Sequence, residues 1–169
     1  MSDGDAMEKI KILLDEIYSL LCEKNLTVAT AESCTGGMIG ASLTSVPGIS
    51  QYYGYGFVTY SNEAKQKLIG VKSETLEEFG AVSSNTAIEM AEGALRVSGA
   101  DIAVSVTGIA GPGGGTLLKP VGLVYVGCAT KSGKRFFEKL NLSGSRDEIR
   151  IQTVQNALAI LKLRLQQYR

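Results

Sequence analysis

Reactive side chains and glycines gather in three segments of the sequence, each directly after an expected strand. The segments are residues 32–37 (ESCTGG), residues 60–65 (YSNEAK) and residues 107–116 (TGIAGPGGGT). In open α/β sheets, ligands bind outside the carboxyl ends of the strands. The three segments therefore predict one site at that end of the sheet, formed by a serine, a lysine and a glycine-rich loop.

The first segment places Ser33 where a strand turns into a helix, so that its hydroxyl can face a crevice. The free amides of Cys34, Thr35, Gly36 and Gly37 can then hold an oxyanion. The spacing alone favours another role, in which Ser33 or Thr35 caps the helix, because these residue types before a helix are usually caps. Cys34 is a rival nucleophile, since a helix N-terminus lowers a thiol pKa, although free cysteines are usually small buried apolar residues.

The second segment offers Lys65 as a base. With Asn62 as the helix N-cap, Lys65 falls in the first turn, where the positive end of the helix dipole lowers the pKa of a lysine. A neutral lysine can accept the proton of a serine hydroxyl. The commoner alternative is a solvated surface lysine. Tyr60 either orients this proton transfer or covers the core as a strand residue.

The third segment is rich in glycine, so its backbone amides can approach a phosphate closely. It has neither the Walker A pattern nor GxGxxG spacing, which argues against a nucleoside triphosphatase and a dinucleotide dehydrogenase. A plain flexible loop is the rival interpretation. Arg146 and Arg150 flank the first turn of the last expected helix, where arginines and free amides can hold a phosphate, but two solvated arginines are the commoner outcome.

Composition narrows the chemistry further. The 169 residues include no histidine, which excludes a Ser-His-Asp triad, a Cys-His pair and histidine metal ligation. Cys22, Cys34 and Cys128 are odd in number and far apart, so we expect no disulfide framework, no metal and no cofactor. Lys plus Arg and Asp plus Glu balance at 17 each, so no direct nucleic-acid binding is expected. The absence of a long apolar run and of an apolar leader predicts a cytoplasmic protein without a membrane span.

Hydrophobic periodicity predicts strands and helices in alternation. Helices are expected over residues 7–24, 38–43, 63–69, 75–79, 83–98 and 149–165, and strands over residues 26–31, 52–60, 102–106, 121–129 and 134–142. Ser145 and Glu148 have the spacing of a capping box. The last two strands should form an antiparallel hairpin around residues 131–133. This order predicts one α/β domain over residues 1–169, with a mixed, mostly parallel sheet between helical layers.

Several segments together resemble the C-terminal domain family of the competence/damage-inducible protein CinA. They are AESCTGG at 31–37, GFVTYSNEAK at 56–65, GAVS at 80–83, AVSVTGIAGPGGGT at 103–116 and KPVG at 119–122. The resemblance runs from about residue 20 to the last helix and implies a three-layer α/β/α sandwich with a mixed five-stranded sheet. Many members carry a nucleotide-associated domain before this one. No such domain is present in this sequence, so we expect the stand-alone form. Members often read Gly-Asp-Arg where this chain reads Gly144-Ser145-Arg146, which puts the local hydrogen bonding in doubt.

The family includes nicotinamide mononucleotide deamidases, which hydrolyse the carboxamide to give nicotinate mononucleotide and ammonia. The resemblance implies a hydrolase with Ser33 as nucleophile and Tyr60 and Lys65 as its partners, acting on a pyridine mononucleotide, and a homo-oligomer. The alternative is a non-catalytic nucleotide-binding or regulatory module of the competence and damage response. The residues expected to bind substrate are Cys34, Thr35, Gly36, Gly37, Thr107, Gly108, Gly111, Gly113, Gly114 and Arg146.

Overall fold

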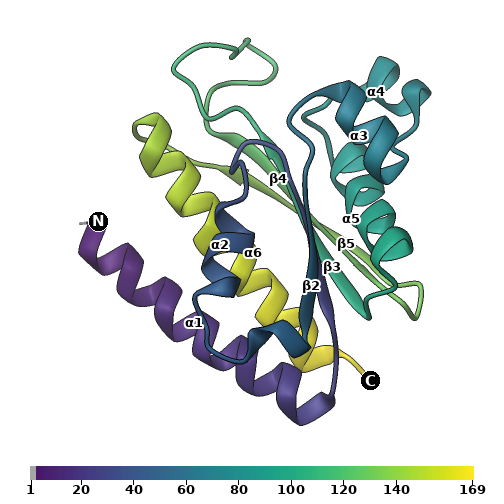
Figure 1. Cartoon of the computed structure of the whole chain (residues 1–169). Helices are drawn as coiled ribbons and strands as arrows, with labels where there is room; N and C mark the ends of the chain where they lie inside the picture. Colours follow the sequence, from purple (N-terminus) through teal and green to yellow (C-terminus); the bar gives the residue numbers. More distant parts are fainter. Residues whose placement is uncertain (1–2) are drawn as a thin grey trace.

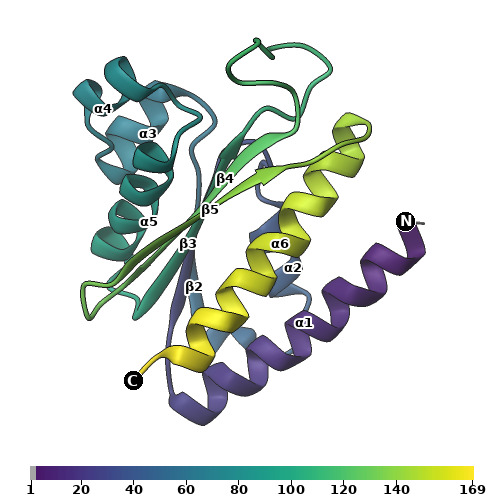
Figure 2. The ribbon, with the colours of Figure 1, turned by 180° about the vertical axis from the view of Figure 1, so that it is seen from behind.

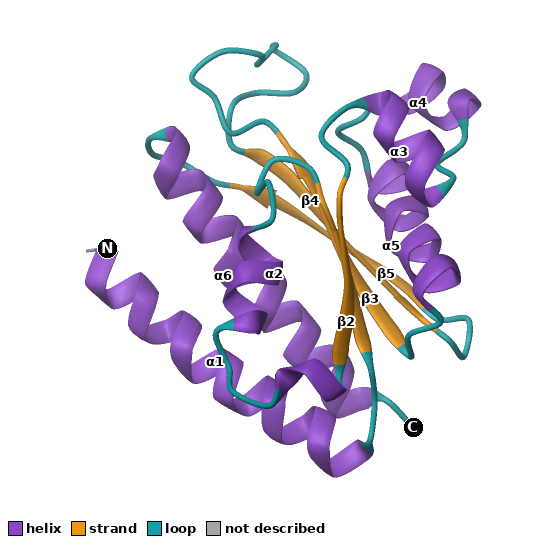
Figure 3. Ribbon diagram, in the orientation of Figure 1, coloured by secondary structure: helices purple, strands orange, loops and turns teal. Residues whose placement is uncertain are grey.

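The computed structural model describes residues 3–169, and the first two residues of the polar N-terminal stretch lie outside the described part. One five-stranded sheet stands between two layers of helices (Figure 1, Figure 3). The strands, in the spatial order β2-β1-β3-β4-β5, are β1 (Val28–Glu32), β2 (Tyr53–Val58), β3 (Ile102–Gly108), β4 (Leu123–Thr130) and β5 (Arg135–Asn141). The predicted three-layer α/β/α architecture is confirmed.

Strand directions make the sheet mixed. β1 pairs in parallel with β2 and with β3, whereas β4 runs antiparallel to both of its neighbours, β3 and β5. Four strands therefore point one way and only β4 points the other, as expected for a mixed, mostly parallel sheet. The antiparallel β4–β5 pair was predicted. The antiparallel β3–β4 pair was not, because the long loop over residues 109–122 joins these strands without the tight turn that marks a hairpin in sequence.

Two groups of helices cover the two faces of the sheet. One face carries α1 (Asp3–Lys24), α2 (Met38–Thr44) and α6 (Arg146–Gln167), and the other carries α3 (Asn62–Ile69), α4 (Ser73–Phe79) and α5 (Ser84–Ser98). A 3₁₀ turn, η1 (Ile49–Gln51), precedes β2. α1 lies alongside α6 in both views, and α5 packs on β3 and β4 (Figure 2). Within residues 3–169, none of the helices has the length and apolar content needed to cross a membrane.

The two faces bury different kinds of side chain. Between the sheet and α1 and α6 the core holds large aliphatic residues, including Ile17, Val104 and Leu158, all buried. On the other face the core under α5 is rich in alanine, and these small side chains allow the helix to lie close to the sheet. A Cβ atom at Gly93 of α5 would overlap the backbone of Ile69 in α3, so glycine is needed there. This close packing fixes α3, the helix that carries the lysine of the site.

Helix starts follow local capping rules. At α6 the predicted capping box is confirmed: Ser145 Oγ accepts from the Glu148 amide at 3.3 Å, and the Glu148 carboxylate accepts from the Ser145 amide at 2.6 Å. Ser145 therefore does the capping work expected of an aspartate. At α3 the predicted cap is wrong, because Ser61 and not Asn62 accepts from the helix, at 3.0 Å from the Ala64 amide.

Candidate active site

A cavity of about 300 Å³ lies where β1 and β3 end and the three glycine-containing or polar segments meet. Most of the residues singled out in the sequence line it together. They are Ser33, Cys34, Tyr60, Lys65, Thr107, Gly108, Gly111, Gly113, Gly114 and Arg146. Thr35, Gly36 and Gly37 do not line this cavity. The expected convergence of the three segments at one end of the sheet is therefore present in the fold.

Lys65 and Ser33 form the polar centre of the cavity. The Lys65 side chain is only 1% exposed, and its Nζ lies 3.0 Å from Ser33 Oγ and 2.8 Å from the carbonyl oxygen of Thr59. Among residues 3–169, no carboxylate forms an ion pair with it. The commoner alternative of a solvated lysine is therefore wrong for this side chain.

Burial lowers the pKa of Lys65 from its ordinary 10.5 to about 8. The main cause is the loss of water around the ammonium group, because a charge in a dry environment costs free energy that no carboxylate returns here. The helix dipole named in the sequence-based expectation is at most an addition to this effect. Near pH 8 a substantial fraction of Lys65 is uncharged, and an uncharged amine 3.0 Å from a hydroxyl can take its proton.

Ser33 is free for such a role because another residue caps α2. The helix begins after Gly37 without a cap from a serine or threonine hydroxyl. The buried Glu32 carboxylate takes this place: it accepts hydrogen bonds from Thr35 Oγ1 at 2.6 Å and from the amides of residues 39–40 at 2.8 and 3.0 Å. The predicted capping role of Ser33 or Thr35 is therefore wrong. Sequence reasoning missed Glu32, whose one signal is a carboxylate at the end of an apolar strand.

The amides of the turn over residues 33–37 are unequal in their availability. The Gly36 amide donates to the Ser33 carbonyl at 3.0 Å, so it is already engaged within the turn. Thr35 is fully buried behind the cavity wall, and Gly37 is the N-cap residue of α2. Cys34 lines the cavity itself, and among the residues that the structure describes no oxygen atom accepts a hydrogen bond from its amide. Within this turn, the Cys34 amide is best placed to meet a ligand oxygen.

The Cys34 thiol is in an inert setting. Its side chain is buried against Ala110, Val124 and Ile149. Burial raises the pKa of this thiol to about 11, so the reactive thiolate is scarce at neutral pH. The rival assignment of Cys34 as nucleophile therefore loses support, and its side chain acts as an apolar anchor for the turn.

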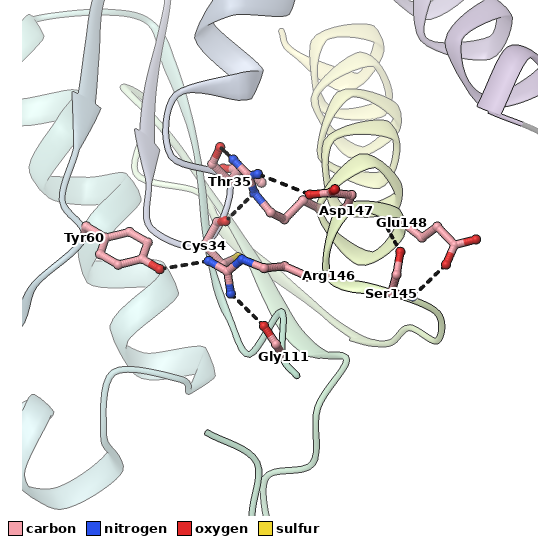
Figure 4. A network of polar contacts seen from close by, with 9 residues as sticks. Cys34, Thr35, Tyr60, Gly111, Ser145, Arg146, Asp147 and Glu148 are labelled. Carbon is pink, nitrogen blue, oxygen red and sulfur yellow. Dashed lines mark hydrogen bonds and ion pairs between the residues drawn. The ribbon is translucent and has the colours of Figure 1, made fainter. Parts of the chain in front are cut away.

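Arg146 and Tyr60 close one side of the cavity. They point toward one another from the start of α6 and from the segment after β2 (Figure 4). Arg146 Nη2 donates to the Tyr60 hydroxyl at 3.1 Å, and Nη1 donates to the Gly111 carbonyl at 2.7 Å. Tyr60 is 62% exposed, and no hydrogen bond in the described chain joins it to Lys65. Its hydroxyl is thus oriented toward the arginine.

The remaining wall comes from the end of β3 and the loop after it. Thr107 is buried and its hydroxyl donates to the Ala81 carbonyl at 2.7 Å, which joins β3 to the segment before α5. Gly111 and Gly114 have left-handed backbone angles, φ 78° and 84°, which favour glycine. In residues 3–169, no group of three or more His, Cys, Asp or Glu side chains is arranged to hold a metal ion.

The sequence pairs Arg150 with Arg146 as candidate phosphate ligands, and the structure separates the two. Arg150 lies outside the cavity lining, and its Nε and Nη2 donate to the carbonyl oxygens of Cys34 and Thr35, each at 3.2 Å. The sequence could not reveal this arrangement, because backbone carbonyls more than a hundred positions away carry no sequence signal.

Known proteins are similar to this chain in sequence and in fold. The model of the CinA C-terminal domain matches residues 10–165. A CinA-like protein of Endomicrobium trichonymphae is 58% identical over 146 residues, which cover 86% of this chain and 34% of the relative. The chain thus spans about a third of the length of the curated relatives that it matches.

Solved structures agree over nearly the whole chain. The competence/damage inducible protein CihA of Agrobacterium tumefaciens superposes with a TM-score of 0.90 at 46% identity, covering 94% of this chain and 96% of that one. A competence damage-inducible protein A of Klebsiella pneumoniae gives a TM-score of 0.91 at 34% identity, covering 95% and 99% of the two chains. The chain belongs to the CinA C-terminal domain family.

Proposed function

We propose that this protein is an amidase that hydrolyses the carboxamide of nicotinamide mononucleotide to nicotinate mononucleotide and ammonia. The observation that carries the proposal is the buried Lys65 amine, which lies 3.0 Å from the Ser33 hydroxyl and has no carboxylate in the described part of the chain to keep it charged. A chain without histidine needs another base to activate a serine, and a lysine of lowered pKa is such a base. The family resemblance supplies the substrate.

In the proposed first half-reaction, neutral Lys65 takes the Ser33 proton while Oγ attacks the carboxamide carbon. The oxyanion that forms lies toward the Cys34 amide, whose partial positive charge stabilises it. Lys65 then gives the proton to the amide nitrogen, the carbon–nitrogen bond breaks, and ammonia leaves an ester on Ser33. In the second half-reaction Lys65 accepts a proton from water, hydroxide attacks the ester, and the proton returns to Ser33 as nicotinate mononucleotide departs.

Substrate binding is assigned to the exposed side of the cavity. The Arg146 guanidinium, held between the Tyr60 hydroxyl and the Gly111 carbonyl, offers its charge to the ribose phosphate. Backbone amides of Gly113 and Gly114 in the same wall can add donors to that phosphate. Tyr60 in this scheme orients Arg146, which differs from the expected direct assistance to Lys65. Phosphate binding of this kind orients the amide near Ser33.

The test compares ammonia release from nicotinamide mononucleotide with release from free nicotinamide. We expect the wild type to act on the mononucleotide and to act far more slowly on nicotinamide, because the free base lacks the phosphate anchor. Ser33→Ala should release no ammonia, while Ser50→Ala, an exposed serine of η1, should match the wild type. Binding of the mononucleotide without turnover by the wild type would instead indicate a non-catalytic nucleotide-binding module.

A further inference from the structure

Arg150 joins the second turn of α6 to the turn over residues 33–37, called here the Ser33 turn. Two nitrogens of its guanidinium donate to the consecutive carbonyl oxygens of Cys34 and Thr35, each at 3.2 Å. A third nitrogen lies 3.7 Å from the exposed Asp147 carboxylate. The Arg150 side chain is 27% exposed and lies over Gly36, where an added Cβ would be 3.6 Å from Nη2. Its hydrogen bonds thus fasten the backbone beside Ser33.

The Ser33 turn needs such a fastening. Gly36 and Gly37 have left-handed backbone angles, φ 59° and 103°, and glycines restrict the chain least. The Ser33 amide is held by the Val106 carbonyl at 3.0 Å, and Glu32 holds the Thr35 hydroxyl at 2.6 Å.

These two contacts tie the Ser33 amide to β3 and the Thr35 side chain to Glu32, whereas Arg150 ties the carbonyl oxygens of residues 34–35 to α6. The Cys34 carbonyl has no donor other than Arg150 in the described chain, and the Thr35 carbonyl has one more, the Met38 amide at 3.2 Å. An arginine can bridge two neighbouring carbonyls because its nitrogens form a rigid fork. Arg150 therefore joins two consecutive carbonyls of the turn to α6.

We propose that Arg150 is a positioning residue that keeps Ser33 Oγ within reach of Lys65 by bridging the Cys34 and Thr35 carbonyls. Its kinetic consequence rests on the proposed amidase function, whereas its effect on the turn does not. Displacement of a reacting group by about 1 Å can slow an enzyme about a hundredfold, so loss of the bridge should lower kcat. Arg146, one helical turn earlier, faces the cavity and should govern KM instead.

Cysteine alkylation reports on the turn without any need for turnover. Cys34 is 6% exposed within the turn, and Cys128 is fully buried in β4, away from it. Iodoacetamide labelling, read for each cysteine by peptide mass spectrometry, should be about ten- to a hundredfold faster at Cys34 in Arg150→Met than in the wild type. This range corresponds to the loss of hydrogen bonds to a charged group. Labelling of Cys128 should stay slow, since only the turn loosens.

Steady-state kinetics supplies the second readout. Arg150→Met should lower kcat for the mononucleotide about ten- to a hundredfold and change KM by less than about twofold. Arg150→Lys should recover part of kcat, because an ammonium group can bind a carbonyl but cannot bridge two as a fork. Arg164→Met is the matched control: this arginine of the same helix stacks on Phe136 at 3.8 Å, far from the turn. It should keep wild-type kcat and Cys34 protection.

Wild-type labelling of Cys34 together with wild-type kcat in Arg150→Met would overturn the assignment. A similar increase over the wild type in the labelling rates of Cys34 and Cys128 in Arg150→Lys would also overturn it, because Arg150 would then support the whole fold and not the turn. This milder variant decides the question if Arg150→Met does not fold. Should the wild type release no ammonia, the amidase proposal fails, and the labelling comparison still decides the role of Arg150.

Discussion

The two ends of the sheet both carry cationic side chains, but the environments of these side chains are opposite. At the end away from Ser33, a cavity of about 580 Å³ beside the β4–β5 turn is lined by basic side chains and one acid. They are Lys72, Arg96, Lys131, Lys134, Arg135 and Glu92. The three lysines are exposed to water, and Arg135 is paired with Glu92. At the other end, Lys65 is 1% exposed and has no carboxylate partner in the described chain.

This difference shows that the environment of a charge matters more than the number of charges. A solvated lysine keeps its proton at neutral pH and contributes little to stability. A lysine without water or a counter-ion holds its proton weakly, and burial lowers the pKa of Lys65 to about 8. Proteins retain such costly arrangements mainly at functional sites.

The largest expected effect comes from making the same substitution at both ends. Lys65→Met removes the base, so kcat for ammonia release should fall about ten-thousandfold or more, as for removal of members of other catalytic units. Lys131→Met at the basic end should leave kcat unchanged, because this side chain is exposed and remote. Steady-state ammonia assays measure both. Comparable losses of kcat in the two variants would show that the two ends of the sheet do not differ in function.

The pH dependence of the free energy of unfolding should show how much the burial of charged Lys65 destabilises the fold. Between about pH 8 and pH 10.5, the unfolded chain binds the proton that folded Lys65 has released, so the free energy of unfolding of the wild type rises with pH. Below about pH 8 the lysine is charged in both states and the desolvation cost, about 3 kcal/mol for such a shift, is fully present.

Lys65→Met lacks this titration and serves as the reference. Urea unfolding at pH 7 and at pH 10.5 should show the wild type gaining about 3 kcal/mol relative to the methionine variant. A difference between the two proteins that stays constant with pH would mean that Lys65 has an ordinary pKa in the folded state.

Arg146 provides an intermediate case, because it is a cation at the Ser33 end of the sheet that remains exposed. Arg146→Met should raise KM for the mononucleotide about ten- to a hundredfold, the usual value of a charge-assisted contact to phosphate, with little change in kcat. Activity on free nicotinamide should not change, because that molecule has no phosphate. A loss confined to kcat would place Arg146 in the chemical step and remove it from substrate binding.

The smallest expected effect is the pH dependence of activity, which tests whether Lys65 differs from the solvated lysines at the other end of the sheet. The base must be uncharged, so kcat/KM should increase about tenfold per pH unit below about pH 8 and level off above it. Rate measurements from pH 6 to pH 10 locate the midpoint. A profile that is flat across pH 8 would show that a lysine with this pKa does not limit the reaction.

Local signals made most of the elements predictable from the sequence. The Ser145 and Glu148 capping box needs only a three-residue spacing, and the α3 cap was misplaced by a single position, from Ser61 to Asn62. Strand directions were harder to predict. β4 runs antiparallel to β3 after a long loop, and the length of a loop does not reveal the direction of the next strand. The segments that meet around Ser33 were grouped by the rule that ligands bind at the carboxyl ends of strands, and the resemblance to the family supports the same grouping.

Contacts between distant segments could not be predicted. Nothing near Lys65 in the sequence shows that its side chain is buried, because this burial results from packing of the whole domain. Glu32 acts on backbone amides of the next helix, and Arg150 acts on backbone carbonyls of another segment. Such partners have no side-chain signature, so the roles of both residues were identified only from the structure.

The atom that carries the acyl group during turnover decides whether Ser33 is the nucleophile. Rapid quenching of the wild type with nicotinamide mononucleotide, followed by peptide mass spectrometry, should place the pyridine carbonyl on Ser33, with ammonia released in the same turnover. Ser33→Ala should show neither the adduct nor ammonia. An acyl group on Cys34, or ammonia release by Ser33→Ala at the wild-type rate, would contradict the assignment of Ser33 and Lys65 as the reacting pair.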